Sequence, residues 1–227
     1  MEKRETTLIA QDTLQFEELV TTQHSATVSD TRLKDDGFAM TDIEKIHTIA
    51  GHFREIMSTL GLDLTEDSLK GTPDRVARMY VKEIFSGLSP LNKPEISLSD
   101  NRYQYKQMLV EKNIALCSCC EHHFLPIMGK VHVAYISSGN VITSSNLQQI
   151  IQYYARRPQV QGRLTIQIAD KLKSVLNTED VAVVIDAVNL CASLRGFNDR
   201  NNTTFTTEYG GAFLSAERKR EFLSYIA

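Results

Sequence analysis

The sequence contains no uninterrupted apolar run near the roughly 20 residues that a membrane-spanning helix needs. It also lacks an apolar segment at its start, where residues 1–10 carry charges of both signs, so we expect no signal peptide. Neither sign of charge is in large excess, because the formal net charge is -3 over 227 residues. The overall charge therefore gives no reason to expect nucleic acid or an anionic membrane as a partner. We predict a cytoplasmic protein with no membrane and no nucleic acid partner.

Cysteine is scarce, and the few cysteines present are unevenly placed. Of the four in the chain, three are Cys117, Cys119 and Cys120, which lie too close together for an ordinary disulfide framework. In a reducing compartment, metal binding and free thiols are the more common uses of such residues. We expect Cys117 and Cys119 to be small buried residues. Either thiol is also a candidate for capturing a metal or for pairing with Cys120.

Internal repeats and low-complexity tracts are absent too, and the length suits one large domain or one domain with a tail. Residues 1–40 are polar without a lasting hydrophobic period, which predicts a flexible extension. Residues 41–90 carry a helical period that begins at a capping-box pattern, with Thr41 as N-cap and Glu44 reaching back. Residues 91–227 alternate strand and helix patterns and are predicted to form the main domain.

The order of these patterns predicts the fold class. Helices are expected at residues 42–60, 73–86, 145–156, 159–176 and 217–225, and strands at 108–116, 130–136, 181–188 and 203–209. Hairpins separated by a pair of helices favour an antiparallel sheet with helices on one face, which is an α+β fold.

The residues with the clearest chemistry lie in two segments that are far apart in the chain. One is Cys120-Glu121-His122-His123, and the other begins at Cys191. Two thiolates and one imidazole suit Zn²⁺ and leave its fourth tetrahedral position for water, which is the arrangement of a catalytic zinc site. The alternative is a buried cysteine pair beside a core histidine.

Several motifs in this order resemble the GTP cyclohydrolase I family, and the resemblance covers about residues 41 to 227. The matching segments are Thr72 to Tyr80, Cys120 to His123, Arg157 to Gln161 with Arg163 to Thr165, and Cys191 to Gly196. Because separate motifs agree in both order and spacing, chance is a poor explanation for the match.

The resemblance implies the tunnelling fold, or T-fold, with residues 91–227 as its catalytic domain. In this family the subunit sheets join edge to edge into a barrel, and the usual particle is a decamer of two stacked pentamers. Such joining also removes the exposed sheet edges that one subunit leaves. Active sites then lie between subunits, and Arg75 is a candidate for serving a neighbour's site.

The resemblance also implies the roles of individual residues. Cys120, His123 and Cys191 correspond to zinc ligands. His122 corresponds to an acid–base group, which an imidazole that titrates near neutral pH suits. The implied reaction on a purine nucleotide is hydration at C8, opening of the imidazole ring, loss of formate and closure to a pterin. The residues that remain for substrate binding are Arg75, Ser145, Gln161 and Arg195.

Four positions depart from the family pattern. Asn189 replaces a second catalytic histidine, and an amide cannot shuttle a proton at neutral pH. Gly162 replaces the glutamate that grips the guanine base, so that a strong specificity element is missing. Asn146 and Gln149 replace a lysine and an arginine of the triphosphate site. The metal ligands are thus kept while the substrate anchors are changed.

This selectivity leaves three hypotheses open. The first is a zinc hydrolase that opens a purine-like ring, with an altered substrate or a truncated reaction. In this hypothesis Asn189 is a catalytic residue and Gly162 is a substrate-binding residue. The second is an ordinary GTP cyclohydrolase I that makes 7,8-dihydroneopterin triphosphate, with Arg156, Asp199 or Arg200 replacing the missing charges. The third is a catalytically weak paralogue with a structural or regulatory role.

Overall fold

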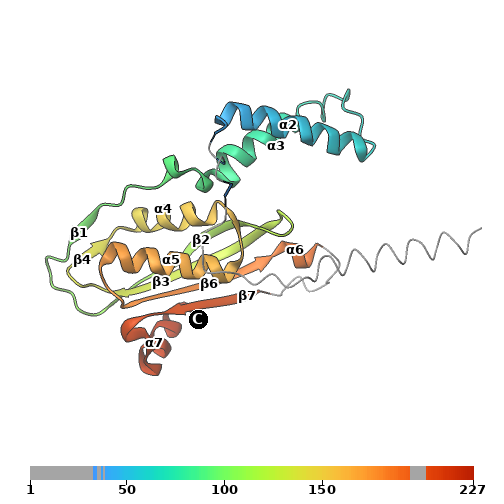
Figure 1. Ribbon diagram of the computed structural model, residues 1–227. Coiled ribbons are helices and arrows are strands. Elements are labelled where there is room, and N and C mark those ends of the chain that lie inside the picture. Colours follow the sequence, from blue (N-terminus) through green and yellow to red (C-terminus); the bar gives the residue numbers. More distant parts are fainter. Residues whose placement is uncertain (1–32, 35–36, 38, 195–202) are drawn as a thin grey trace, which may run out of the picture.

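The structure is a computed structural model that describes residues 33–34, 37, 39–194 and 203–227. The predicted extension of residues 1–40 therefore lies almost entirely outside the described residues. A pair of helices projects from a sheet that carries further helices (Figure 1). The described chain is a mixed α+β structure, as the sequence predicts.

The projecting part is the N-terminal arm, which we define as residues 42–85. Its first helix, α2 (Asp42–Thr59), begins with the predicted capping box: Thr41 Oγ1 accepts from the Glu44 amide at 3.3 Å, and Glu44 Oε2 accepts from the Thr41 amide at 2.7 Å. For the second, α3 (Thr72–Met79), the pair Thr72-Pro73 predicts Thr72 as the N-cap, but the structure has Gly71 at that position. Instead, Thr72 Oγ1 accepts a hydrogen bond from Arg75. A π-helical turn, η1 (Tyr80–Ile84), completes the arm.

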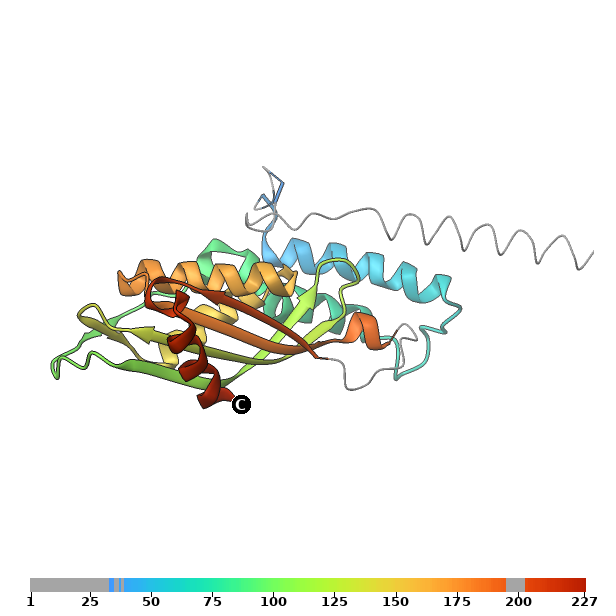
Figure 2. The same cartoon turned by 90° about the horizontal axis from the view of Figure 1, so that it is seen from below.

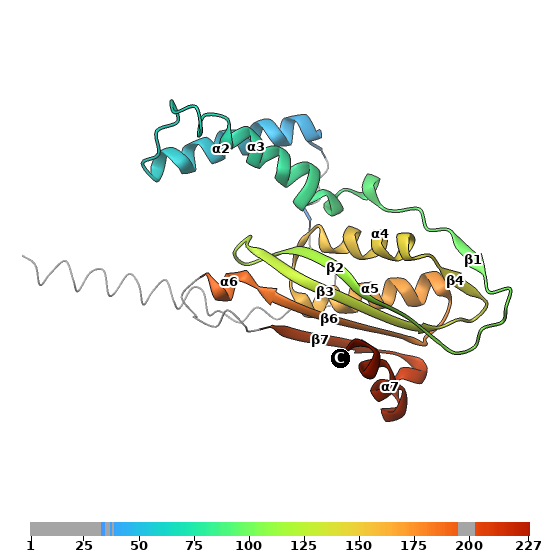
Figure 3. The same ribbon diagram turned by 180° about the vertical axis from the view of Figure 1, so that it is seen from behind.

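The main sheet has the strand order β5-β2-β3-β6-β7. Its members are β2 (Met108–Cys120), β3 (Pro126–Ile136), β5 (Pro158–Gln159), β6 (Val181–Asn189) and β7 (Thr204–Tyr209). The four longer strands run antiparallel, as predicted, and lie side by side in Figure 3, whereas the short β5 pairs parallel to β2. A separate antiparallel pair joins β1 (Leu98–Asp100) to β4 (Asn140–Ile142).

Two helices cover one face of the sheet and bury the main core. They are α4 (Ser144–Ala155) and α5 (Gln161–Leu176). Because side chains alternate along a strand, the odd-numbered residues of β3 and β6, such as Val133 and Val183, face these helices. Leu164, Ile168 and Leu172 of α5 meet them there and are fully buried. Short 3₁₀ turns, η2 (Ser86–Leu88) and η3 (Pro90–Asn92), lead from the arm toward this layer.

The last helix corrects the prediction that all helices lie on one face. The chain passes through the turn η4 (Gly211–Leu214) into α7 (Ala216–Ile226). Phe222 of α7 and Phe213 pack against Ala134 and Val184, which are even-numbered residues and point to the opposite face. Figure 1 shows α7 on the side of the sheet away from α4. In the described part of the chain, no helix is both long and apolar enough to cross a bilayer.

Strand register brings the predicted site residues to one end of the sheet. Cys120 ends β2 and pairs with Gln159 of β5. Asn189 ends β6 and pairs with Ile127 at the start of β3. The short helix α6 (Leu190–Ser193) follows directly, so that Cys191 emerges at this same end (Figure 2).

Candidate metal centre

The first metal-ligating segment is a tight turn between β2 and β3, which we call the ligand turn (residues 120–125). The Cys120 amide donates to the Leu125 carbonyl at 2.8 Å, and the Phe124 amide donates to the Cys120 carbonyl at 2.9 Å. These bonds fold the chain back within a few residues. Cys120, His122 and His123 are therefore presented together on one short loop at the end of the sheet.

The structure brings the three predicted metal ligands together. Cys120 Sγ, one ring nitrogen of His123 and Cys191 Sγ all lie within 4.8 Å of one another, and this group can hold a metal ion. A tetrahedral zinc ion with bonds of about 2.0–2.3 Å places such ligand atoms roughly 3.5–3.8 Å apart. The sulfur of Cys120 is 4.0 Å from His123 Nδ1, which is close to that spacing. Donor types and distances therefore fit a zinc ion with an open position.

The thiols near the turn differ in exposure and acidity. Burial, and then the neighbouring Cys120, raises the pKa of Cys191, so zinc binding there must displace a proton. Burial raises the pKa of Cys119 to about 11, with Cys120 and Cys117 adding to the shift. Cys119 is buried, as predicted, but Cys117 is exposed, and that prediction is wrong. Both side chains lie on the face away from α4, which covers only the other side of β2.

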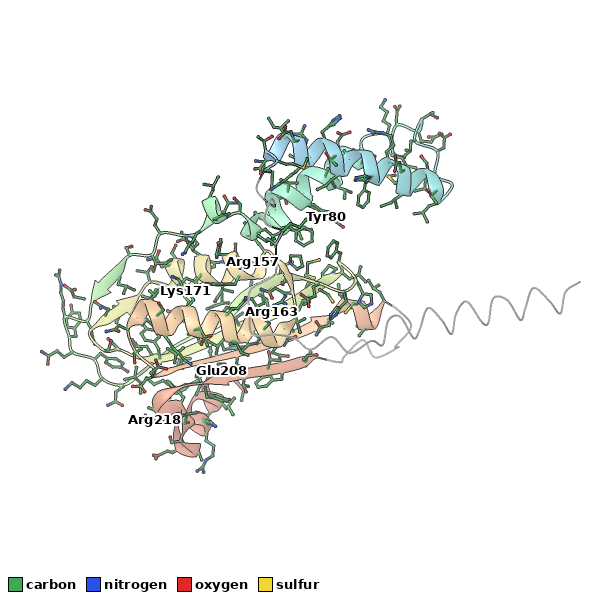
Figure 4. All side chains as sticks on the ribbon, viewed as in Figure 1. Tyr80, Arg157, Arg163, Lys171, Glu208 and Arg218 are labelled. Atoms are coloured by element: carbon green, nitrogen blue, oxygen red, sulfur yellow. The ribbon has the colours of Figure 1, made fainter. Side chains whose placement is uncertain are left out.

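A buried polar network holds the ligand turn from the α5 side. Arg163, on the first turns of α5 (Figure 4), has a side chain that is only 7% exposed and donates to Glu121 Oε2 at 2.6 Å. It also donates to Gln159 Oε1 at 3.0 Å and to the Pro158 carbonyl at 2.9 Å. The other oxygen of Glu121 lies 3.7 Å from His122 Nε2. The candidate acid–base imidazole of His122 thus lies near a carboxylate that Arg163 holds in place.

Gln161 and Asn189 lie together beside β7. Asn189 Nδ2 donates to Gln161 Oε1 at 3.2 Å and to Thr204 Oγ1 at 3.1 Å. Gln161 Nε2 in turn donates to the Thr204 carbonyl at 2.7 Å and to Thr206 Oγ1 at 3.2 Å. Both amides are therefore held by hydrogen bonds to neighbouring groups of the chain.

Gly162 marks an open space in the first turn of α5. Apart from its own helix, no described atom lies within 4 Å of the position that a Cβ would take there. Its backbone is helical and unstrained. The chain therefore has room for a larger side chain at the position where the family pattern has a glutamate.

Two of the predicted substrate-binding residues lie away from this end of the sheet. Arg75 lies in the arm, where its guanidinium donates to Thr72 and to the Ser68 carbonyl. Ser145 is exposed on the first turn of α4, which begins beside β4, at the opposite end of the sheet from α6 (Figure 1). Arg195 lies outside the described residues. Within the described residues, the metal group is thus assembled, whereas Arg75 and Ser145 lie away from it.

Two of the positions considered for phosphate binding line one cavity. Gln149 and Arg156, on the outer side of α4, face Lys82 and Glu95 across a space of about 480 Å³. Lys82 also forms an ion pair with Asp42. The other proposed replacements, residues 199 and 200, lie outside the described residues. The cavity therefore carries charges of both signs rather than a purely cationic surface.

Sequence reasoning gave no role to two residues that support the ligand turn. Arg163 was part of a recognised motif, and its place among apolar residues on the buried face of α5 was a usable signal. Phe124 has a φ of +53°, which is unusual for a bulky residue. A left-handed conformation costs a residue with a Cβ about 1–2 kcal/mol, and no sequence pattern signals it here. Arg163 contacts the turn from α5, and Phe124, within the turn, contacts Tyr80 and Phe85, so both contacts join residues that are distant in sequence.

Comparison with known proteins adds an independent finding. The family model described as GTP cyclohydrolase I matches residues 49–227. The chain is 57% identical over 194 residues to "GTP cyclohydrolase 1" of Flavobacterium johnsoniae, covering 86% of this chain and 87% of that protein. Proteins of the same name in Aeromonas salmonicida and Escherichia coli O1:K1 are 47% and 50% identical, over 82% and 78% of this chain and 85% and 81% of theirs.

Proposed function

The chain belongs to the GTP cyclohydrolase I family, and from this premise we propose that it is a zinc-dependent hydrolase that opens the imidazole ring of GTP. The products are 7,8-dihydroneopterin triphosphate and formate. The observation that carries the proposal is the convergence of Cys120, His123 and Cys191 from two distant segments. The names of the relatives favour GTP over the altered substrate that the sequence departures suggest.

The residues of this chain divide the work of that reaction. A zinc ion held by Cys120, His123 and Cys191 would activate water near neutral pH. His122 would donate and accept protons at the ring nitrogens of the substrate, and Glu121 Oε1 lies 3.7 Å from its Nε2. Gln161 and the open space at Gly162 face the heterocycle from α5.

A second candidate is a reaction that ends at the ring-opened product. Asn189 favours it, because an amide hydrogen-bonded to Gln161 and Thr204 cannot carry a proton between substrate atoms. General acid–base catalysis typically contributes about 10²–10⁴-fold, so the steps after ring opening would be slowed most. Formation of a formamide-bearing pyrimidine nucleotide without free formate would distinguish this outcome.

We further propose a homo-oligomer, with the family's decamer of two pentamers as the expected particle. Arg75 and Ser145 lie away from the metal group of their own chain, which supports a site completed by a neighbouring subunit. The unpaired edges of β5 and β7 offer surfaces for such assembly. The four free thiols support a reducing location such as the cytoplasm.

The test combines three measurements on one purified sample: zinc per subunit, formate released from GTP, and fluorescence of the oxidised product. One zinc per subunit with formate and a fluorescent pterin supports the proposal. Zinc without formate but with a ring-opened nucleotide selects the second candidate. Absence of both zinc and turnover contradicts the enzymatic proposal and leaves the weak structural paralogue.

A further inference from the structure

The ligand turn is joined to the N-terminal arm by aromatic rings. The Phe124 ring lies 5.2 Å from that of Phe85 and 6.5 Å from that of Tyr80, measured between centroids. Tyr80 also contacts Phe85 at 5.2 Å and Phe53 of α2 at 5.9 Å. Figure 4 shows Tyr80 where the arm meets the rest of the molecule. The residue that follows ligand His123 is thus the point at which the arm touches the turn.

Two local irregularities of the backbone meet at this contact. Phe124 is held in the left-handed region, which a bulky side chain rarely adopts without support from its surroundings. Tyr80 begins the π-helical turn η1, a rare feature that is frequent at functional sites. Phe124 is nonetheless 49% exposed as a residue, so it is not a core residue held by packing on all sides. Among the described residues, its ring contacts with Tyr80 and Phe85 are both with the arm.

The other side of the turn is held separately. Arg163 holds Glu121 through a hydrogen bond of 2.6 Å, from the α5 side. The rings hold Phe124 from the arm side. His122 and His123 lie in the chain between these two supported residues.

We propose that Phe124 is a positioning residue through which the N-terminal arm holds the ligand turn, so that retention of the metal depends on the rings of Tyr80 and Phe85. The inference rests on the zinc centre of the proposed function. Groups outside the ligand set that orient a metal ligand commonly change metal affinity by about 10–100-fold when they are removed.

The experiment measures the rate at which zinc-loaded, full-length protein releases zinc to a colorimetric chelator. Phe124→Leu and Tyr80→Leu should each speed release by about tenfold. The two rings act on the same turn, so their effects should not add. The double variant Phe124→Leu/Tyr80→Leu should therefore release zinc at about the rate of the faster of the two single variants. Tyr80→Phe keeps the ring and should behave like the unchanged protein. Phe124→Gly removes both ring and backbone strain and should still release zinc quickly.

Phe222→Leu is the matched control, because it removes a buried ring on the far face of the sheet. It should lower the melting temperature without changing zinc release. Cobalt-substituted protein gives a second readout, in which Phe124→Leu should shift the thiolate-to-metal absorption band and Phe222→Leu should not. Equal effects of Phe124→Leu and Phe222→Leu on zinc release would overturn the inference. Strictly additive effects of Phe124→Leu and Tyr80→Leu on zinc release would also overturn it.

The outcome is separable from that of the proposed function. If the unchanged protein holds zinc but does not turn over GTP, the positioning role is still tested and only the function fails. If it holds zinc and Phe124→Leu changes neither readout, only the positioning role fails. If it cannot hold zinc, both are overturned.

Discussion

The ligand turn and the predicted substrate-binding positions differ in the chemical groups that they present. At the turn, Cys120 and His123 meet Cys191 of α6 with ligand atoms within 4.8 Å of one another, a buried arginine holds Glu121, and aromatic rings lie against Phe124. At the substrate positions, Gly162 leaves open space and Asn189 offers only an amide. From this contrast we expect metal binding and substrate recognition to depend on separate residues, and the variants below test that expectation.

The largest expected effect comes from removing a metal ligand. Cys120→Ala should lower zinc affinity by well over 100-fold, beyond the usual cost of losing an outer partner, and should abolish turnover. Cys119→Ala, which removes a neighbouring buried thiol with a pKa of about 11, is the control and should retain one zinc per subunit. Zinc analysis after dialysis checks both. One zinc per subunit in Cys120→Ala would contradict the assignment of Cys120 as a metal ligand.

The next largest effect should come from refilling the substrate positions. Gly162→Glu combined with Asn189→His should raise GTP turnover by roughly 10²-fold or more, since it restores a base anchor and a proton carrier. The space around Gly162 allows the longer side chain. Gly162→Ala adds volume without the carboxylate and should leave the rate unchanged. If the double change brings no gain in formate release, the pocket differs from the family's in more than these positions.

Stability should respond differently to two ion pairs of similar length. Arg163→Met breaks the pair with Glu121, whose side chains are 7% and 26% exposed, and should cost about 1–3 kcal/mol of unfolding free energy after allowing for partial exposure. Arg218→Met breaks the pair with Glu221, at 35% and 37% exposure, and should cost less than about 1 kcal/mol. Urea unfolding of both variants makes the comparison. Equal losses would remove the special standing of the Arg163 network.

The smallest expected effect is on the pH dependence of stability, and it comes from His132, a histidine outside the group of metal ligands. Burial, and then Lys130, lowers the pKa of His132 from its usual 6.5, with Asp186 opposing and Lys112 adding to the shift. The unfolded chain therefore binds this proton more readily, and stability should fall as the pH drops through 6.5 toward the lower folded pKa. His132→Gln keeps an acceptor for the Asn113 amide and should flatten that slope.

The exposed His52 provides the comparison for this pH effect. His52→Gln should leave the dependence of unfolding free energy on pH as it is in the unchanged protein. A matched loss of slope in both variants would show that the effect does not belong to His132.

Much of the framework was predictable from the sequence because it depends on local patterns. The helix that starts at the Thr41 capping box and the strand of residues 181–188 follow from capping and hydrophobic period, and the structure has both. The family resemblance implied Cys120, His123 and Cys191 as metal ligands, and the structure brings these three residues together. The family is confirmed by the comparisons.

Other features depend on contacts that no local pattern encodes. The position of α7 on the opposite face follows from the packing of Phe222 against Ala134, residues far apart in the chain. The exposure of Cys117 depends on which face of β2 the helices cover. The left-handed Phe124 depends on rings supplied by the arm. Tertiary contact, rather than propensity, decided each of these.

The most direct test of the proposed zinc site at Cys120, His123 and Cys191 is zinc-edge X-ray absorption on the purified, unmodified protein. We predict two sulfur neighbours at about 2.3 Å and two nitrogen or oxygen neighbours at about 2.0–2.1 Å, which correspond to Cys120, Cys191, His123 and one water. A shell of three or four sulfurs would mean that Cys117 or Cys119 closes the site, and would contradict the account.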